Sequence, residues 1–505
     1  MAEAHAGKGY LACAGKFRTF LQRTPIRKLI GLMLICVCSS SFSLTLNDNG
    51  GINATPISFI VNVKSETDIL RAIQQANNQH IPIAIMGKQH SQGGQTLIHK
   101  AIELNMLPFN KVLTINKQKK QVTVQSGIVW GDLQKAINPY NLAIKSMQSP
   151  NIFTVGGSMS VNAHGDDFRS GSVGNSIIAF HMLLANGKKV YVNPVTQPDL
   201  LASVVGGYGL LGVVTDVTLQ LTDNDLLLSE YHETDVSGFP SYFFNKILKK
   251  KDIALFYAHL NIAPGPRFLR DMYVITYKDT HQLPDKVIAL DNPDKWNRIL
   301  TPIFNISRQS TLGKKLRWDT EKRVFSKIYK NHIITRNNAM EKPLKFASDH
   351  YKAGHADWLQ EYFIPPNKLT QFVRTLRQVM LENNVNILNV TIRSVPKETN
   401  LFLSYSTQRS FAVVLYFDQN LSDKELDCVK LWTPRLIDTA LSLGGNYYLP
   451  YQPYASKKQF QKAYPGYTTF LNLKRQIDPA ELFKNKLYMN YLLITNEFIS
   501  SNLMD

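Results

Sequence analysis

Apolar positions in the first part of the chain change from strand-like runs to a helix-like spacing and back. Residues 59–63 (FIVNV) form an apolar run that predicts a β-strand. Ser65 and Asp68 follow with the three-residue spacing of a helical capping box. Apolar residues then recur on one face of the predicted helix: Ile69, Ile73 and Ala76. A second run at 81–86 predicts another strand, so the order strand, helix, strand indicates a mixed α and β fold.

Two β-hairpins are predicted further along the chain. Apolar residues at 112–115 and 122–124 flank a polar turn rich in lysine. The dipeptide Asn186-Gly187, which suits a type I′ turn, separates two strand-like stretches at 181–185 and 188–192. After Thr222 glycine becomes rarer and longer helix and strand patterns begin, so we predict a domain boundary there.

The N-terminal segment has the pattern of an export signal. Six basic residues precede a short apolar core at 29–37, and a serine-rich stretch follows at 39–43. The core is shorter than the roughly 20 residues that a membrane helix needs. We therefore expect residues 1–45 to be a signal or a membrane anchor, and the protein to be exported or membrane-associated (on the periplasmic side in a bacterium). A presequence added by a misplaced start codon is the alternative.

Composition excludes several classes of protein. The 505 residues allow two or three domains, and 44% apolar with 19% charged residues is typical of a globular protein. Only four cysteines occur, three of them within the first 38 residues, which argues against a disulfide framework or a zinc site, and we expect no metal. The net charge of +19 suggests an anionic neighbour such as membrane lipid, a nucleotide or an acidic polymer.

Much of the positive charge lies in one segment. Residues 295–345 contain 13 Lys and Arg against three acidic residues, with aromatic residues between them. One interpretation is a solvated helix and loop. The other is a surface that faces anionic lipid or a phosphorylated substrate.

Two glycine-rich segments carry the candidate chemistry. The first, residues 87–94 (GKQHSQGG), directly follows a predicted strand, where backbone N–H groups can converge on phosphate oxygens. The second, residues 154–174, contains three clusters of small residues around His164. Each segment alone is an ordinary turn more often than a cofactor site. The presence of two such segments, separated by strands and a helix, favours a bound nucleotide cofactor.

A third glycine motif excludes two rival folds. Residues 207–212 match the dinucleotide fingerprint GxGxxG literally. A Rossmann unit needs a helix after this motif, whereas residues 213–221 alternate like a strand. A protein kinase would also require a catalytic His-Arg-Asp loop and an Asp-Phe-Gly motif, and the sequence contains neither.

These segments resemble the FAD-binding PCMH-type domain of the vanillyl-alcohol oxidase family. Residues 87–91 resemble its pyrophosphate loop, residues 154–174 its second flavin-contacting segment, and residues 199–215 its closing motif. The resemblance, strongest to sugar-lactone oxidases, alditol oxidases and decaprenylphosphoryl-ribose oxidases, implies an α+β fold. It implies a two-subdomain FAD-binding domain at 55–222 and an α/β substrate (cap) domain at 223–443. A C-terminal segment at 444–495 would return to the flavin.

FAD is the cofactor that the resemblance implies. The residues expected to bind it are Gly87, Lys88, Gln89, His90, Ser91, Gln92, Gly93, Thr154, Gly156, Gly157, Ser158, Asn162, His164, Gly165, Gly171, Gly174 and Val214. In relatives a histidine at the position of His90 often links covalently to the flavin 8-methyl carbon. The alternative is a histidine that contacts FAD without a bond. Gln89 stands where the family usually has glycine.

Four residues are candidates for catalysis by the same resemblance. Arg393 matches the arginine of a Glu-x-Arg strand in alditol oxidases, with Thr391 in place of the glutamate. Glu361 is a candidate for the missing carboxylate. His164 is expected beside the flavin ring, to orient substrate or to act as a structural donor. Tyr451 falls where several relatives have a lysine, and its hydroxyl can donate a hydrogen bond.

The expected function is oxidation of a CH–OH group of a sugar, sugar lactone, polyol or related alcohol by hydride transfer to flavin N5. Oxygen, a quinone or another carrier would accept the electrons. A membrane surface is a further expected partner and nucleic acid is not. One alternative is an enzyme like decaprenylphosphoryl-ribose oxidase, acting on a lipid-phosphate sugar, which the basic segment favours. A non-catalytic, basic, exported binding protein explains the charge but not the paired glycine segments.

Overall fold

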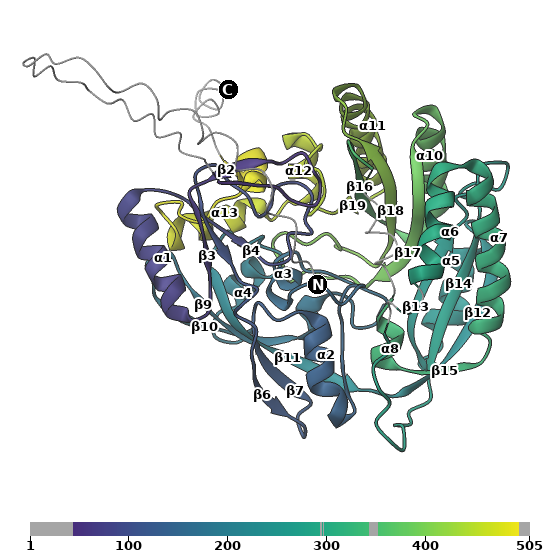
Figure 1. Ribbon diagram of the computed structural model, residues 1–505, viewed down its shortest axis with the longest axis horizontal. Coiled ribbons are helices and arrows are strands. Elements are labelled where there is room, and N and C mark those ends of the chain that lie inside the picture. Colours follow the sequence, from purple (N-terminus) through teal and green to yellow (C-terminus); the bar gives the residue numbers. More distant parts are fainter. Residues whose placement is uncertain (1–43, 293–294, 296, 343–351, 494–505) are drawn as a thin grey trace, which may run out of the picture. The chain divides into compact units, whose positions relative to one another are not determined.

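The computed structural model describes residues 44–292, 295, 297–342 and 352–493. These residues belong to one compact unit built from three larger sheets and the helices that cover them (Figure 1). The predicted signal or anchor at residues 1–45 lies almost wholly outside the described residues. Among the helices that are described, none combines the length and the apolar character needed to cross a membrane.

The first larger sheet is parallel and follows the predicted strand–helix–strand order. Its three strands have the spatial order β3-β5-β4, and helix α1 packs against them. Ser65 and Asp68 form the predicted capping box, which is confirmed. The elements of this part are β1 (Leu44–Leu46), β2 (Thr55–Ile57), β3 (Phe59–Asn62), α1 (Glu66–Gln79), β4 (Ile83–Met86) and β5 (Ile102–Asn105).

The second sheet is antiparallel and contains both predicted hairpins. Its order is β10-β9-β11-β7-β6, with β8 paired to the end of β11. The hairpins β6–β7 and β9–β10 are confirmed, and the strand after the GxGxxG motif is β11, as predicted. The elements are β6 (Val112–Asn116), β7 (Gln121–Gln125), α2 (Trp130–Ile137), β8 (Leu142–Ile144), α3 (Val155–Ser160), β9 (Ile177–Leu183), β10 (Lys189–Val192), α4 (Pro198–Val204) and β11 (Val213–Asp223).

The third sheet has eight strands in the order β15-β12-β14-β13-β17-β18-β16-β19. The predicted boundary after Thr222 falls at the end of β11, just before this sheet begins. Its strands are β12 (Leu226–Asp235), β13 (Ile253–Leu260), β14 (Asp271–Asp279), β15 (His332–Thr335), β16 (His355–Ile364), β17 (Asn386–Val395), β18 (Ser410–Asn420) and β19 (Asn446–Tyr447). The helices between them are α5 (Phe239–Tyr242), α6 (Asn297–Gln309), α7 (Thr311–Ile328), α8 (Arg336–Met340), α10 (Leu369–Glu382) and α11 (Asp423–Ser442).

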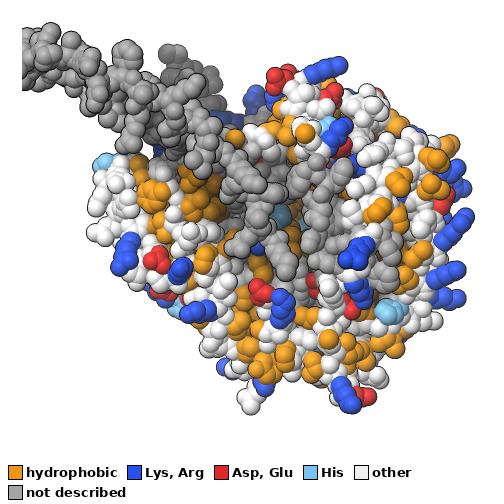
Figure 2. Space-filling model, viewed as in Figure 1, with side chains coloured by type: hydrophobic (Ala, Val, Ile, Leu, Met, Phe, Trp, Pro, Cys, Tyr) orange, Lys and Arg blue, Asp and Glu red, His pale blue; other side chains and the backbone are white. Residues whose placement is uncertain are grey.

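Two helix pairs cover opposite faces of the third sheet (Figure 1). On β18 the ring of Phe417 lies 5.6 Å from that of Trp432 in α11, whereas the adjacent Tyr416 lies 6.5 Å from Phe304 in α6. Because neighbouring side chains on a strand point to opposite faces, α10–α11 cover one face and α6–α7 the other. Apolar and basic side chains lie close together over the region of α6 and α7 (Figure 2).

The C-terminal part returns to the first sheet. Helices α12 (Lys457–Ala463) and α13 (Tyr467–Ile477) are followed by a stretch in which Phe483 forms a parallel bridge with Ile83 of β4. Lys474 and Asp478 form a buried ion pair there, and Asp478 also accepts hydrogen bonds from the backbone of Leu482 and Phe483. The α+β fold class is confirmed, while the domain limits themselves stay predictions.

Candidate active site

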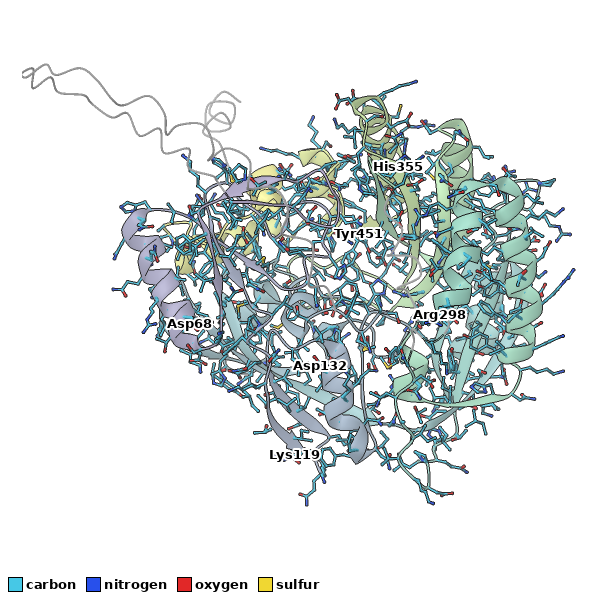
Figure 3. The ribbon with its side chains drawn as sticks, viewed as in Figure 1. Asp68, Lys119, Asp132, Arg298, His355 and Tyr451 are labelled. Carbon is cyan, nitrogen blue, oxygen red and sulfur yellow. The ribbon has the colours of Figure 1, made fainter. Side chains whose placement is uncertain are left out.

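A cavity of about 1050 Å³ lies between the glycine-rich segments and the third sheet. This volume is at the upper end of the roughly 300–1,000 Å³ typical of ligand and cofactor sites. Its walls come from the loop after β4, the segment around α3, the turn at 207–212, strands β16–β18 and residues 448–451. Tyr451, one of the lining residues, is labelled in the interior of the unit in Figure 3, whereas Asp68 and Lys119 are labelled near its periphery.

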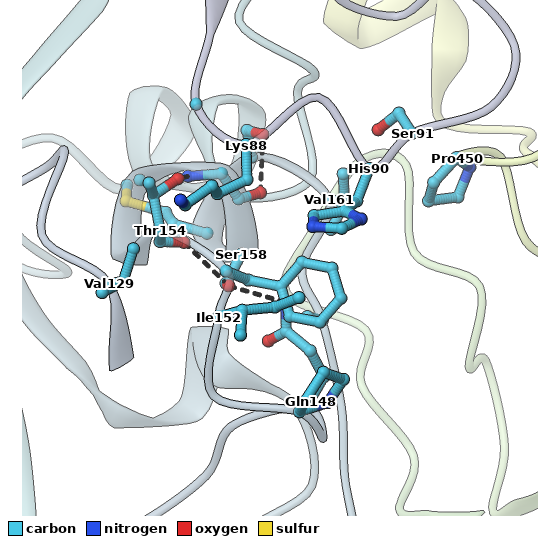
Figure 4. A pocket seen from close by; sticks show the side chains of 18 of the residues that line it. Lys88, His90, Ser91, Val129, Gln148, Ile152, Thr154, Ser158, Val161 and Pro450 are labelled. Carbon is cyan, nitrogen blue, oxygen red and sulfur yellow. Dashed lines mark hydrogen bonds between the residues drawn. The ribbon is translucent and has the colours of Figure 1, made fainter. Parts of the chain in front are cut away.

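The first glycine segment meets the second at the start of α3. A Cβ atom on Gly87 would lie 2.3 Å from Oγ1 of Thr154, so only glycine allows this approach. That Oγ1 accepts a hydrogen bond from the backbone N–H of Gly157 and caps α3. Figure 4 shows Lys88 and His90 of the first segment and Thr154 and Ser158 of the second around the same cavity. The two segments therefore form one cradle, as their resemblance to a cofactor site implied.

Unsatisfied polar groups line this cradle. Within the residues that the structure describes, the backbone N–H groups of residues 88–91 donate no hydrogen bond. Oγ of Ser126 and Oε1 of Gln148 are also buried without a partner on the cavity wall. Buried polar atoms are normally hydrogen-bonded, so these groups fit a large polar ligand. Consecutive N–H groups in a tight loop suit the pyrophosphate of FAD, and the amide and hydroxyl suit the polar edge of a flavin.

The sequence-predicted FAD residues divide into two groups. Eleven line the cavity: Gly87, Lys88, Gln89, His90, Ser91, Thr154, Gly156, Gly157, Ser158, His164 and Val214. Six lie behind its wall: Gln92, Gly93, Asn162, Gly165, Gly171 and Gly174. The second group shapes the cavity indirectly. Gln92 exchanges two hydrogen bonds of 2.8 Å with the backbone of β16, and a Cβ on Gly165 would lie 2.0 Å from the carbonyl oxygen of Met147.

His90 is held in a half-buried position at the cavity. Its ring packs edge-on against Phe153 with centroids 4.7 Å apart, and Nδ1 lies 3.4 Å from Nδ2 of Asn49. Burial, with a smaller contribution from the charge of Lys88, lowers the pKa of His90 to about 4. The imidazole is therefore neutral at physiological pH.

Three of the four predicted catalytic residues meet at one point on the cavity wall. Nε2 of His164 lies 2.5 Å from Oε1 of Glu361, and both side chains are almost fully buried. The hydroxyl of Tyr451 donates to Oε2 of Glu361 at 3.3 Å. Burial and the charge of Glu361 raise the pKa of Tyr451 well above its usual range, so this hydroxyl keeps its proton. Nε2 is thus the ring nitrogen of His164 that faces Glu361, and Nδ1 is a buried atom without a partner.

Arg393 lies nearby in a second cluster. Its Nε is 3.2 Å from Oδ1 of the buried Asp166, whose other oxygen is paired with Lys342. Burial, opposed in part by Asp166, lowers the pKa of Lys342 to about 8. Arg393 and Lys342 both line the cavity, as do the carboxylates of Glu361 and Glu341. Lys342 escaped the sequence analysis because one lysine in a lysine-rich segment carries no distinctive pattern.

Glu398 is another residue that the sequence analysis missed. It is buried, and its two oxygens accept hydrogen bonds of 2.7 Å from Ser172 and Asn162. The side-chain oxygen of Asn162 accepts in turn from the backbone N–H of Gly174. Burial raises the pKa of Glu398. Glu398, which lies in the connection between β17 and β18, thus fixes the conformation of the second glycine segment.

Comparison with known proteins agrees with this site. Residues 57–193 match the family described as FAD binding domain. The chain is 22% identical over 430 residues to L-gulonolactone oxidase of Mus musculus, covering 83% of this chain and 91% of that protein. It is 26% identical over 178 residues to decaprenylphosphoryl-beta-D-ribose oxidase of Mycolicibacterium smegmatis, covering 35% and 39%. It is 29% identical over 153 residues to L-galactono-1,4-lactone dehydrogenase of Arabidopsis thaliana, covering 30% and 25%.

The protein is therefore an FAD-dependent oxidoreductase. Residues 57–193 form an FAD-binding domain, and FAD is the protein's cofactor. A binding protein without catalytic activity has no support among these relatives.

Proposed function

We propose that the protein oxidises a CH–OH group of a sugar, a sugar lactone or a related alcohol. The observation that carries the proposal is the buried group of His164, Glu361 and Tyr451 on the wall of the cavity. The names of the relatives, which are lactone oxidases and dehydrogenases, support the substrate class. When bound, FAD supplies the acceptor for the hydride that the carbinol carbon loses.

The chain's own residues handle the proton and the position of the substrate. Glu361 holds His164 through Nε2, which leaves Nδ1 as the ring nitrogen that would accept the hydroxyl proton of the substrate. Tyr451 keeps Glu361 in place from the other side. Arg393 and Lys342 offer charged donors to the remaining substrate oxygens.

Anaerobic reduction of the enzyme's flavin by a panel of aldonolactones, polyols and free sugars tests this proposal. His164→Ala should slow reduction by roughly 10²–10⁴-fold, the usual contribution of a general base. Tyr451→Phe should slow it much less, because it removes only a long hydrogen bond to Glu361. A His164→Ala variant that retains FAD and is reduced at the parent rate would refute the role of His164.

A lipid-phosphate sugar is the second candidate substrate. The two cations that line the cavity, Arg393 and Lys342, suit a phosphate group. Similarity to decaprenylphosphoryl-beta-D-ribose oxidase points the same way. Reduction by a phosphorylated sugar, but by none of the neutral lactones and polyols, would favour this candidate.

We also propose that His90 bonds covalently to the 8-methyl carbon of FAD, replacing one hydrogen of that methyl group, and that the two electrons released pass to the enzyme's electron acceptor while two protons go to solvent. The neutral imidazole that its lowered pKa provides is the form that can act as nucleophile. Attachment to the apoprotein should therefore keep a constant rate from about pH 9 down to pH 5 and slow only near pH 4. Acid precipitation measures the bound flavin, and His90→Ala should release it into the supernatant. Flavin that stays with the precipitated variant would show that another residue forms the bond.

Export or membrane association is a separate proposal, supported by the pattern of residues 1–45. Fractionation of cells that express the full chain tests it. Recovery of the intact chain in the cytosolic fraction alone would contradict it.

A further inference from the structure

The outward side of helices α6 and α7 is unusually apolar. Of the 21 large hydrophobic residues exposed among the described residues, six fall within these two helices. They are Ile303, Ile306, Leu312, Leu316, Val324 and Ile328, with 37% to 66% of their surface exposed. Leu312 and Leu316 are four residues apart, as are Val324 and Ile328, so the members of each pair lie next to each other on the helix surface. We refer to these six residues as the hairpin patch.

Basic side chains surround the hairpin patch. Lys315, Arg323 and Lys327 are exposed on α7, and Arg298 is exposed near the start of α6 (Figure 3). The two acidic residues of α7 do not balance them: Asp319 is half-buried, and Glu321 accepts a 2.6 Å hydrogen bond from Arg317. Figure 2 shows basic and apolar side chains side by side over these helices. Among the described residues of α6 and α7, the exposed charges are therefore all positive.

The other side of the hairpin is fixed to the third sheet. Trp318 stacks on Tyr273 with ring centroids 5.3 Å apart, and Nη1 of Arg317 donates to the carbonyl of Leu388 at 2.9 Å. A Cβ on Gly313 would lie 2.3 Å from the carbonyl oxygen of Ile306, so glycine lets the two helices approach closely. The hairpin patch thus faces outward on a rigid support and is not required for the core.

We propose that the hairpin patch docks the protein on an anionic lipid bilayer. An apolar helix face flanked by Lys and Arg is the arrangement with which peripheral proteins enter the headgroup region. The charge pattern disfavours a second copy of this chain as the occupant, because two such faces would bring like charges together. The proposal goes beyond the redox reaction and holds for either candidate substrate.

Docking here would also bring the cavity close to the lipid. Helix α6 packs on the same face of the third sheet that lines the cavity, and Tyr416, the ring neighbour of Phe304, is itself a lining residue. A substrate or electron carrier dissolved in the bilayer would then have a short path to the site.

Flotation of the full chain with vesicles tests the proposal. Vesicles of 30% phosphatidylglycerol in phosphatidylcholine should bind the protein, and pure phosphatidylcholine vesicles should bind it much less. Each basic residue near an anionic surface contributes roughly fivefold to partitioning, so Lys315→Glu, Arg323→Glu and Lys327→Glu together should weaken binding by at least about 100-fold. Leu312→Glu with Leu316→Glu should also abolish flotation. Leu431→Glu, at a 74% exposed position on α11, is the matched control and should bind like the parent.

Several outcomes would overturn the proposal. If the variants of the hairpin patch and of its basic residues float with the vesicles like the parent, membrane binding belongs to another part of the chain. An equal loss in Leu431→Glu would show an effect unrelated to the hairpin patch. A dimer that Leu312→Glu with Leu316→Glu dissociates, without any vesicle binding by the parent, would identify a second copy as the occupant. Flavin reduction by a soluble substrate should be unchanged in all these variants, which separates this test from that of the proposed function.

Discussion

Glu398 and its two donors decide the shape of the second glycine segment. Ser172 and Asn162 are buried and lie on either side of the loop that contains His164. Tyr405 adds a 2.7 Å hydrogen bond to the backbone carbonyl of Asn162. These contacts give Asn162 a supporting role behind the cavity wall.

Replacing Glu398 should destabilise the protein more than replacing one of its donors. Glu398→Ala leaves two buried donors without an acceptor and should lower the free energy of unfolding by about 2–4 kcal/mol. Ser172→Ala removes a single hydrogen bond and should cost about 1 kcal/mol. Denaturant unfolding of the FAD-loaded protein measures both. Equal effects of the two variants would contradict this account.

Single residues were the hardest part of the site to predict from sequence. Gln89 differs from the glycine usual in the family, yet its φ of 54° places it in the left-handed region that glycine favours. The motif therefore located position 89, but it did not reveal that glutamine keeps the left-handed backbone conformation there. Lys342 and Glu398 belong to no motif, and only their folded surroundings distinguish them from other charged residues.

At the scale of elements, strand β5 carries a carboxyl group in an apolar setting. Ile102 and Leu104 pack into the core beneath α1, and Glu103 points to the other face of the sheet, where it is fully buried. Burial raises the pKa of Glu103 to about 8, and the nearby backbone of Ile98 opposes the shift only in part. The side chain is therefore mostly protonated in the folded protein at neutral pH.

This raised pKa predicts a pH-dependent gain from Glu103→Gln. Between about pH 4.5 and pH 8 the unfolded chain loses the proton and the folded chain keeps it, so Glu103 destabilises the fold by up to about 1.4 kcal/mol for each pH unit. The advantage of the variant should be absent near pH 4, grow towards pH 8 and then stay constant. Thermal unfolding across this range measures it. Glu230→Gln, at an exposed position of β12, should show no such trend.

Local elements were largely predictable, whereas their pairing was not. The capping box of α1 and the turn at Asn186-Gly187 depend on neighbouring residues, so the sequence revealed them directly. The third sheet depends on distant partners. Strand β16 pairs with β18 on one side and β19 on the other. Strand β13 pairs with β17, although β14, β15, β16 and helices α6, α7, α8 and α10 lie between them in the sequence. No local pattern specifies such an order.

At the scale of the whole molecule, Asn485 joins three distant parts of the chain. Its buried Nδ2 donates to the carbonyls of Gln95 and Tyr208 at 2.8 and 2.9 Å, and its Oδ1 accepts from the backbone N–H of Tyr488. Gln95 and Tyr208 both line the cavity. The C-terminal segment thus supports two walls of the FAD site, in agreement with the expected return of the chain to the flavin.

Asn485→Ala should weaken stability and cofactor binding together. The variant leaves two buried carbonyls and one N–H without partners, which should lower the free energy of unfolding by about 2–4 kcal/mol. Non-covalently bound FAD should also dissociate faster, as flavin fluorescence after dilution would show. Asn245→Ala, at an exposed position with only exposed partners, is the control. A destabilised variant that holds FAD as tightly as the parent would limit Asn485 to a structural role.

The parallel bridge between Ile83 and Phe483 has a consequence for biosynthesis. A ribosome delivers the glycine loops early, but the chain that braces them emerges only after every strand of the third sheet has been translated. The nascent protein therefore spends most of its synthesis with an unbraced nucleotide-binding half and exposed apolar edges. We therefore expect flavin loading to be complete only after the C-terminal segment has been translated.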